Sequence, residues 1–183
     1  LLLGAAGMLV VHQVVATAVP DGGRVPDPTT PGGTPAERWS RRLPLATVAV
    51  LATFASAPVL QVAYTESLAL LLLASALWCL QNRHYLPAIP LVLALGLTRA
   101  VALPLAIAVV AHAVSRWRDA DHWPGADRWR VGALLAATLA GGLLWPAIVA
   151  ARTGDLRAYT QTQAAWRGRG EVLPLVPWLD VAR

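Results

Sequence analysis

Residues 66–114 read ESLALLLLASALWCLQNRHYLPAIPLVLALGLTRAVALPLAIAVVAHAV, and among them only Glu66, Arg83 and Arg99 carry a formal charge. Arg83 lies in a short polar turn, whereas Glu66 and Arg99 are flanked by long apolar runs. An ionisable side chain at membrane depth is costly, so it usually faces a partner, a cavity or a substrate. Glu66 and Arg99 are therefore the leading candidates for a functional site.

The composition of the whole chain points to a membrane protein. The chain is 56% hydrophobic and 14% charged, whereas soluble domains contain about 25% charged residues. All the positive side chains are arginine, a bias that indicates a GC-rich, bacterial genome. The net charge of +5 fits arginines that hold loops on the cytoplasmic side. Because these arginines are scattered and form no basic face, nucleic-acid binding is not favoured.

The apolar runs predict an all-α, polytopic integral membrane helical bundle, with one transmembrane domain over residues 1–183. A proline-rich, flexible loop is expected at residues 20–42. Because the chain starts and ends next to apolar runs, we expect it to be a fragment of a longer protein. The expected membrane spans are residues 1–19, 43–61, 67–80, 86–98, 100–114 and 131–151.

Residues 86–114 leave two alternatives open. One helix over this segment would be about 43 Å long, against a hydrocarbon core of about 30 Å. A single tilted span fits, and so do two short helices that meet near Arg99, because broken helices are tolerated where they line a protein cavity. The hairpin is favoured by the positive-inside rule, since it gathers most arginines on one side, the cytoplasmic one. These are Arg24, Arg38, Arg41, Arg42, Arg83, Arg116, Arg118, Arg128 and Arg130.

Two interpretations of Glu66 and Arg99 remain open. The two side chains can form a structural ion pair between helices, with no ligand. Alternatively, they line a polar cleft that faces the extracytoplasmic side. In that case Arg99 binds a phosphate, whose oxygens match the guanidinium fork, and Glu66 orients a sugar hydroxyl or Arg99 itself. Tyr64 adds a hydroxyl group at the same depth.

A later polar segment, residues 152–172, is expected to be a loop on the same side as Glu66. It contains Gln163 and Trp166, an amide and an indole of the kinds that bind sugar hydroxyls and pack on sugar rings. Anchoring at the membrane interface is the alternative role for Trp166. No metal site or cofactor is expected. The aspartates at 119, 121 and 127 with His122 lie among arginines in a charge-balanced loop, and the single Cys79 permits no zinc cluster.

Three motifs together resemble the PIG-V-type mannosyltransferases, a family of the GT-C glycosyltransferase superfamily. The first is Ala57-Pro58 followed by Tyr64-Thr65-Glu66-Ser67-Leu68, and the second is Thr98-Arg99-Ala100 after a further span. The third is Gly154-Asp155 followed by Gln163 and Trp166. The resemblance covers about residues 57–166.

The resemblance implies a GT-C-like fold and transfer of mannose from a polyprenyl-phosphate donor to a glycan or lipid acceptor outside the cytoplasm, in the plasma (inner) membrane. It also implies a catalytic acidic base in an outer loop that would precede Leu1. Arg99, Glu66, Tyr64, Gln163 and Trp166 would then bind substrate. A polytopic transporter, with Glu66 and Arg99 as a coupling pair, and a non-catalytic assembly subunit are the alternatives.

Overall fold

The computed structural model describes residues 2–19, 35–54, 65–98, 102–118 and 125–166, and for residues 35–41 the backbone alone. All regular structure in this part of the chain is helical, which confirms the all-α prediction. The helices are α1 (Leu2–Ala18), α2 (Pro35–Thr53), α3 (Glu66–Gln81), α4 (Tyr85–Thr98), α5 (Ala102–Arg118), α6 (Gly125–Thr153) and α7 (Ala158–Trp166).

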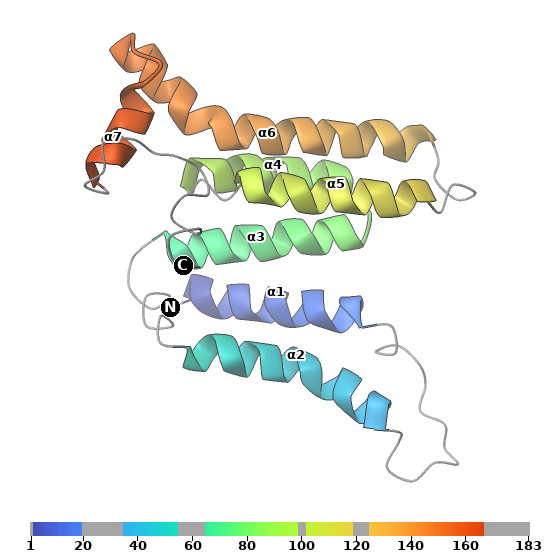
Figure 1. The fold of residues 1–183 in the computed structure, drawn as a ribbon. Coiled ribbons are helices and arrows are strands. Elements are labelled where there is room, and N and C mark those ends of the chain that lie inside the picture. Colours follow the sequence, from blue (N-terminus) through green and yellow to red (C-terminus); the bar gives the residue numbers. More distant parts are fainter. Residues whose placement is uncertain (1, 20–34, 55–64, 99–101, 119–124, 167–183) are drawn as a thin grey trace, which may run out of the picture. The chain divides into compact units, whose positions relative to one another are not determined.

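The chain forms two units, residues 1–142 and residues 143–183, and α6 runs from the first into the second. Within the first unit, α2 packs on α1, α1 on α3, and α3 on α4 (Figure 1). Helices α1 and α3 run in the same direction. Near their carboxyl ends, the Thr17 hydroxyl donates a hydrogen bond of 2.9 Å to Gln81 Oε1.

A tight turn after α3 reverses the chain. Arg83 has a φ of 61°, in the left-handed region that glycine usually occupies after a helix. The backbone N–H of His84 donates to the carbonyl of Cys79 at 2.8 Å, and that of Arg83 to the carbonyl of Leu80 at 3.2 Å. These bonds satisfy carbonyls that the end of α3 would leave open. Helix α4 therefore starts directly and runs back along α3.

Residues 86–114 fold as two helices, α4 and α5, and not as one long helix. The hydroxyl of Tyr85, at the start of α4, forms a hydrogen bond of 3.1 Å with Nε2 of His112, near the end of α5. This bond joins the outer ends of the two helices, whose inner ends are Thr98 and Ala102. The two helices are therefore antiparallel.

Helix α4 also packs on α6 with almost no side chain between the two backbones. A Cβ atom added to Gly96 would lie 2.7 Å from the Cα of Gly141 and closer still to its carbonyl oxygen. A Cβ added to Gly141 would lie 3.2 Å from the carbonyl oxygen of Val92. Around this contact, Leu95 of α4 and Leu134 of α6 are buried in the same core.

Two segments that were expected to be loops are helical in part. Helix α2 begins at Pro35, inside the expected loop 20–42, because the fixed φ of proline suits the first position of a helix. Helix α7 lies inside the expected loop 152–172. Its sequence contains neither glycine nor proline, and Asp155 Oδ1 accepts a hydrogen bond of 2.7 Å from the backbone N–H of Arg157 just before it. The rest of the expected loop 20–42 lies outside the described residues.

Among the described helices, one is long and apolar enough to cross a membrane by length and composition. This is α6, with 29 residues and a mean hydropathy of 1.9 in its most apolar window. Only 22% of that window is buried within the protein, so α6 is not a mostly buried core helix. Helices α1, α3 and α4 are also apolar but shorter than 18 residues.

We expect Gly96→Ala to destabilise the first unit by about 3 kcal/mol, because the new methyl group would collide with the backbone of α6 and force α4 away from it. Thermal unfolding followed by circular dichroism measures the loss. Gly132→Ala is the matched control, since nothing lies within 4 Å of a Cβ added to Gly132. That variant should be neutral or more stable by about 0.5–1 kcal/mol. An unchanged melting temperature for Gly96→Ala would contradict the backbone contact.

Candidate functional site

Glu66 is the first residue of α3, where its negative charge complements the positive end of the helix dipole. Thr65 precedes it with φ −71° and ψ −7° and makes no side-chain cap. The Glu66 side chain is partly buried and its Oε2 atom is fully buried, while the neighbouring Ser67 is 4% exposed. A buried carboxylate oxygen costs free energy unless it is compensated, and the positive end of the α3 dipole supplies part of that compensation.

Glu66 lies at the end of the first unit where α4 stops and α5 starts. Helices α3 and α4 are antiparallel and joined at their other end, so Thr98 returns to the side of Glu66 (Figure 1). The Thr98 hydroxyl donates a hydrogen bond of 2.8 Å to the carbonyl of Leu95. Ala102, the first residue of α5, is fully buried and its Cβ lies near Gly141. The end of α4 and the start of α5 are therefore both held by packing on α6.

Arg99 and Tyr64, two of the five candidate residues, lie outside the described residues. In the chain, Arg99 directly follows Thr98 and Tyr64 directly precedes Thr65. Their predicted roles in binding therefore stay predictions.

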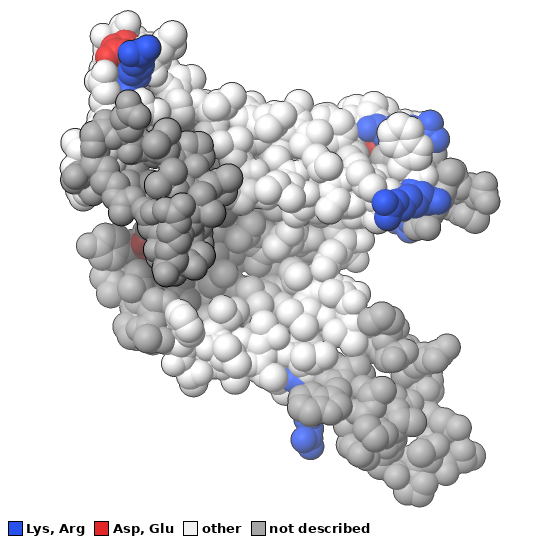
Figure 2. All heavy atoms as spheres, viewed as in Figure 1, with Lys and Arg blue, Asp and Glu red and all other residues white. Residues whose placement is uncertain are grey.

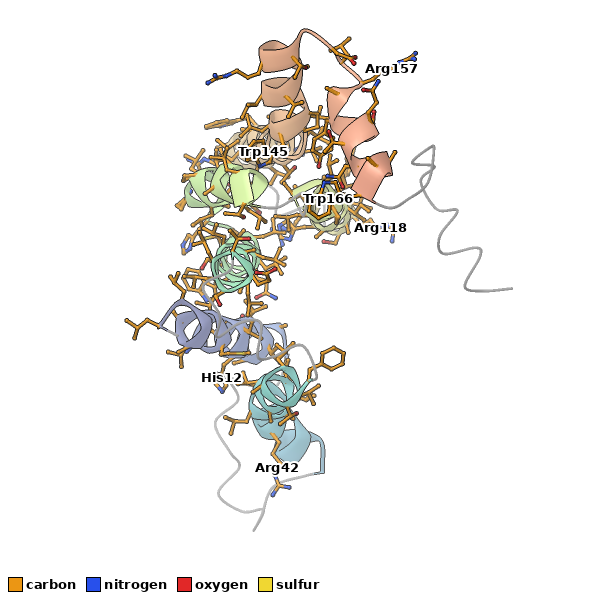
Figure 3. The ribbon with its side chains drawn as sticks, turned by 90° about the vertical axis from the view of Figure 1, so that its left-hand side faces the viewer. His12, Arg42, Arg118, Trp145, Arg157 and Trp166 are labelled. Atoms are coloured by element: carbon orange, nitrogen blue, oxygen red, sulfur yellow. The ribbon has the colours of Figure 1, made fainter. Side chains whose placement is uncertain are left out.

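Gln163 and Trp166 lie on α7, in the second unit. Gln163 is partly buried, whereas the indole of Trp166 is 85% exposed at the end of the helix. The turn before α7 contains Gly154, with a φ of 72°, and Asp155, which accepts the hydrogen bond from Arg157. Arg157 extends away from both helices of this unit (Figure 3). The arrangement presents an amide and an exposed indole on one short helix.

A polar pair that sequence reasoning did not connect lies at the opposite end of the first unit from Glu66. Tyr85 is 1% exposed, and its ring meets the ring of His112 edge-on, with 5.8 Å between centroids. The positions of these two residues in the sequence did not indicate that they would pair, because the pair forms only when α4 and α5 fold back on each other.

Among the described residues, no group of three metal-ligating side chains comes together. Asp119, Asp121 and His122 lie outside the described residues.

No family model, curated protein or solved structure matches this chain.

We expect Tyr85→Phe to destabilise the first unit by about 1–2 kcal/mol, because the variant leaves Nε2 of His112 without its bonding partner. The free energy of unfolding, measured by denaturant titration, tests this. Tyr159→Phe on α7 is the matched control and should be neutral. In a double-mutant cycle with His112→Ala, a coupling energy near zero between Tyr85 and His112 would contradict the hydrogen bond.

Proposed function

We propose that this chain is part of a polytopic membrane glycosyltransferase, which transfers a sugar from a polyprenyl-phosphate donor to an acceptor on the extracytoplasmic side. The motifs that resemble the PIG-V-type family indicate that the transferred sugar is mannose. The single observation that carries the proposal is the position of Glu66. It lies at the same end of the first unit as Thr98 and Ala102. Thr98 is the first residue of the Thr98-Arg99-Ala100 motif, and Ala102 follows the motif closely.

The distribution of charge supports a membrane setting. Between their ends, α1, α3, α4 and α5 carry no arginine, aspartate or glutamate. Figure 2 shows arginines at the end of α5 and the start of α6, whereas Arg42 lies inside α2, away from its ends. Charges at the ends and none between them is the pattern that a hydrocarbon layer imposes on a helical bundle.

The exposed apolar side chains of α5 support the same setting. Leu103, Ile107, Val110 and Val114 recur at helical spacing on one face of α5, and all are exposed, Ile107 by 74%. Soluble monomers rarely expose a continuous apolar stripe of this kind. Acyl chains would cover it without cost. The glycine contact between α4 and α6 fits as well, because small residues are enriched where membrane helices meet.

The lengths of α4 and α5 agree with the hairpin alternative. Helix α4, with 14 residues, is about 21 Å long, less than a hydrocarbon core of about 30 Å. Short helices of this kind are tolerated at membrane depth where the break between them is covered by protein or opens into a polar cavity. We assign the polyprenyl-phosphate head group to the end of the first unit where Glu66, Thr98 and Ala102 lie.

The chemistry of transfer explains why a cation and a carboxylate are needed there. The acceptor hydroxyl gives its proton to a general base as its oxygen attacks the anomeric carbon, and the bond from that carbon to the phosphate oxygen breaks with its electron pair going to the phosphate. Negative charge therefore builds up on the leaving group. We assign the stabilisation of this charge to the guanidinium of Arg99, which binds phosphate oxygens through two donors. Glu66 orients a sugar hydroxyl or Arg99, and Tyr64 adds a hydroxyl. Gln163 and Trp166, on α7 of the second unit, keep their predicted roles in binding the sugar or the acceptor.

Substitution of Arg99 tests the function. In membranes supplied with a polyprenyl-phosphate sugar, Arg99→Ala should lower the rate of transfer by about a hundredfold or more, because a charge-stabilising donor to the leaving group is lost. The amount of protein in the membrane should stay the same. Transfer of radiolabelled sugar to the acceptor fraction measures the effect, and unchanged turnover would eliminate the phosphate-binding role.

Glu66→Gln is the companion variant and separates the site from a structural clamp. It keeps the size of the side chain and removes its charge, so it should impair transfer more than it impairs folding. Equal losses of activity and of melting temperature would favour the ion-pair clamp of a non-catalytic subunit. Accumulation of a solute across the membrane, without sugar transfer, would favour the transporter.

Cysteine labelling tests the placement across the membrane. In a chain with Cys79→Ala, a membrane-impermeant maleimide added outside intact cells should label Gln163→Cys and should not label Arg118→Cys. Cys79 is the single cysteine of the chain, so in the Cys79→Ala background the introduced cysteine is the one thiol that the maleimide can label. Labelling of position 163 only after the cells are opened would overturn the extracytoplasmic placement.

A further inference from the structure

One sequence motif, Arg-Trp-Arg, occurs twice in the chain and has no part in the proposed transfer chemistry. It occupies residues 116–118 and residues 128–130. The two Arg-Trp-Arg motifs flank the α5–α6 connection: the first ends α5 and the second lies in the first two turns of α6. Chain connectivity alone therefore brings two indoles and four guanidinium groups to one end of the first unit.

The structure gathers further polar groups at this end, opposite to Glu66. The hydrogen bond between Tyr85 and His112 brings the start of α4, which follows Arg83, beside the end of α5, which carries Arg116. Figure 2 shows arginines at this end in separate patches, around the end of α5 and the start of α6, with uncharged atoms between them. The α3–α4 turn, the end of α5 and the start of α6 thus lie at the same end of the first unit.

The side chains of the two motifs are displayed in a way that suits an interface. Trp117 is 74% and Trp129 56% exposed, although both indoles are large and apolar. Arg130 donates to Asp127 Oδ1 at 3.2 Å and lies over the Trp129 ring at 5.8 Å from its centroid. Arg130 is thus paired with Asp127 and stacked on Trp129, and the side chains of Arg118 and Arg128 are exposed.

The net charge of this region is small, which limits the class of ligand. Residues 116–130 contain four arginines and three aspartates, a sum of +1. A long polyanion is held by the number of positive charges, and this surface offers few. A single phosphate group beside apolar matter fits better. The guanidinium fork matches its oxygens, and an indole sits at the depth of the lipid glycerol, where tryptophan is enriched.

We propose that the two Arg-Trp-Arg motifs bind the phosphate of an anionic phospholipid head group on the cytoplasmic side of the membrane. Arg118 and Arg128 hold the phosphate, and Trp117 and Trp129 lie against the upper part of the acyl chains. This inference rests on the membrane placement of the proposed function but on none of its transfer chemistry.

Lipid binding to the purified chain in a neutral detergent tests the inference. Phosphatidylglycerol and phosphatidylcholine are titrated separately, and native mass spectrometry counts the lipid molecules retained. The chain should retain phosphatidylglycerol in preference to phosphatidylcholine. The double variant Arg118→Gln/Arg128→Gln should weaken phosphatidylglycerol binding by roughly ten- to thirtyfold, the effect of two arginines near an anionic lipid.

Matched controls separate a built site from general charge. Arg152→Gln/Arg157→Gln removes two exposed arginines from the second unit and should leave binding unchanged. Arg118→Lys/Arg128→Lys keeps the charge but loses the fork, so it should bind at an intermediate level. Circular dichroism verifies that each variant is folded. An equal loss in the two glutamine variants, or equal binding of both lipids, would overturn the proposal.

A competition arm and the transfer assay complete the design. Inorganic phosphate at the same concentration should not displace the lipid, and displacement would show a free-anion site in place of a lipid site. Because the readout is lipid retention, selective binding in a chain without transferase activity would refute the proposed function alone. Transfer activity without lipid selectivity would refute this inference alone.

Discussion

The contact between Gly96 of α4 and Gly141 of α6 is the constraint on which the first unit depends. Two helix backbones can meet this closely only where neither carries a side chain. The next residue of α6, Gly142, leaves room for Leu103 of α5, so three helices share one crossing region. In a hydrocarbon environment the hydrophobic effect does not drive helices together, and close packing of small residues takes its place. The inner ends of α4 and α5 are therefore held by this close backbone packing together with the apolar core that includes Leu95 and Leu105.

The same constraint positions the residues around the proposed site. Thr98 and Ala102 stand next to the glycine crossing, and Glu66 starts a helix that packs along α4. Catalytic groups need rigid supports, because small displacements of a reacting group lower the rate strongly. At the far end of the hairpin, the bond between Tyr85 and His112 keeps α4 and α5 in register. One apolar and one polar contact thus hold the two ends of the α4–α5 pair.

The charged side chains of α3 and α5 lie at helix ends, and the two ends of these helices differ in character. At one end a carboxylate with a buried oxygen lies beside the break between α4 and α5. At the other, arginines and exposed indoles surround the α5–α6 connection. The first arrangement suits the proposed chemistry on a sugar-donor head group, and the second suits the proposed binding of one lipid phosphate. The apolar helices between them keep these two environments apart.

The amino-acid sequence by itself determined that the protein is helical, where its apolar runs lie and which ionisable residues interrupt them. Composition and the spacing of charged residues carry that information directly, because burial of apolar side chains and solvation of charges are local properties. Local rules misplaced the starts of two helices: Pro35 was taken for a loop residue, and Ala158–Trp166 for a loop, although a first-turn proline and a run without glycine are both compatible with helix. Only the tertiary structure decided that Gly96 meets Gly141 and that Tyr85 meets His112. The physical reason is that a glycine contact is made by backbone atoms that every residue has, and a hydrogen bond between distant helices depends on how the chain folds back, so neither partner is marked in the sequence.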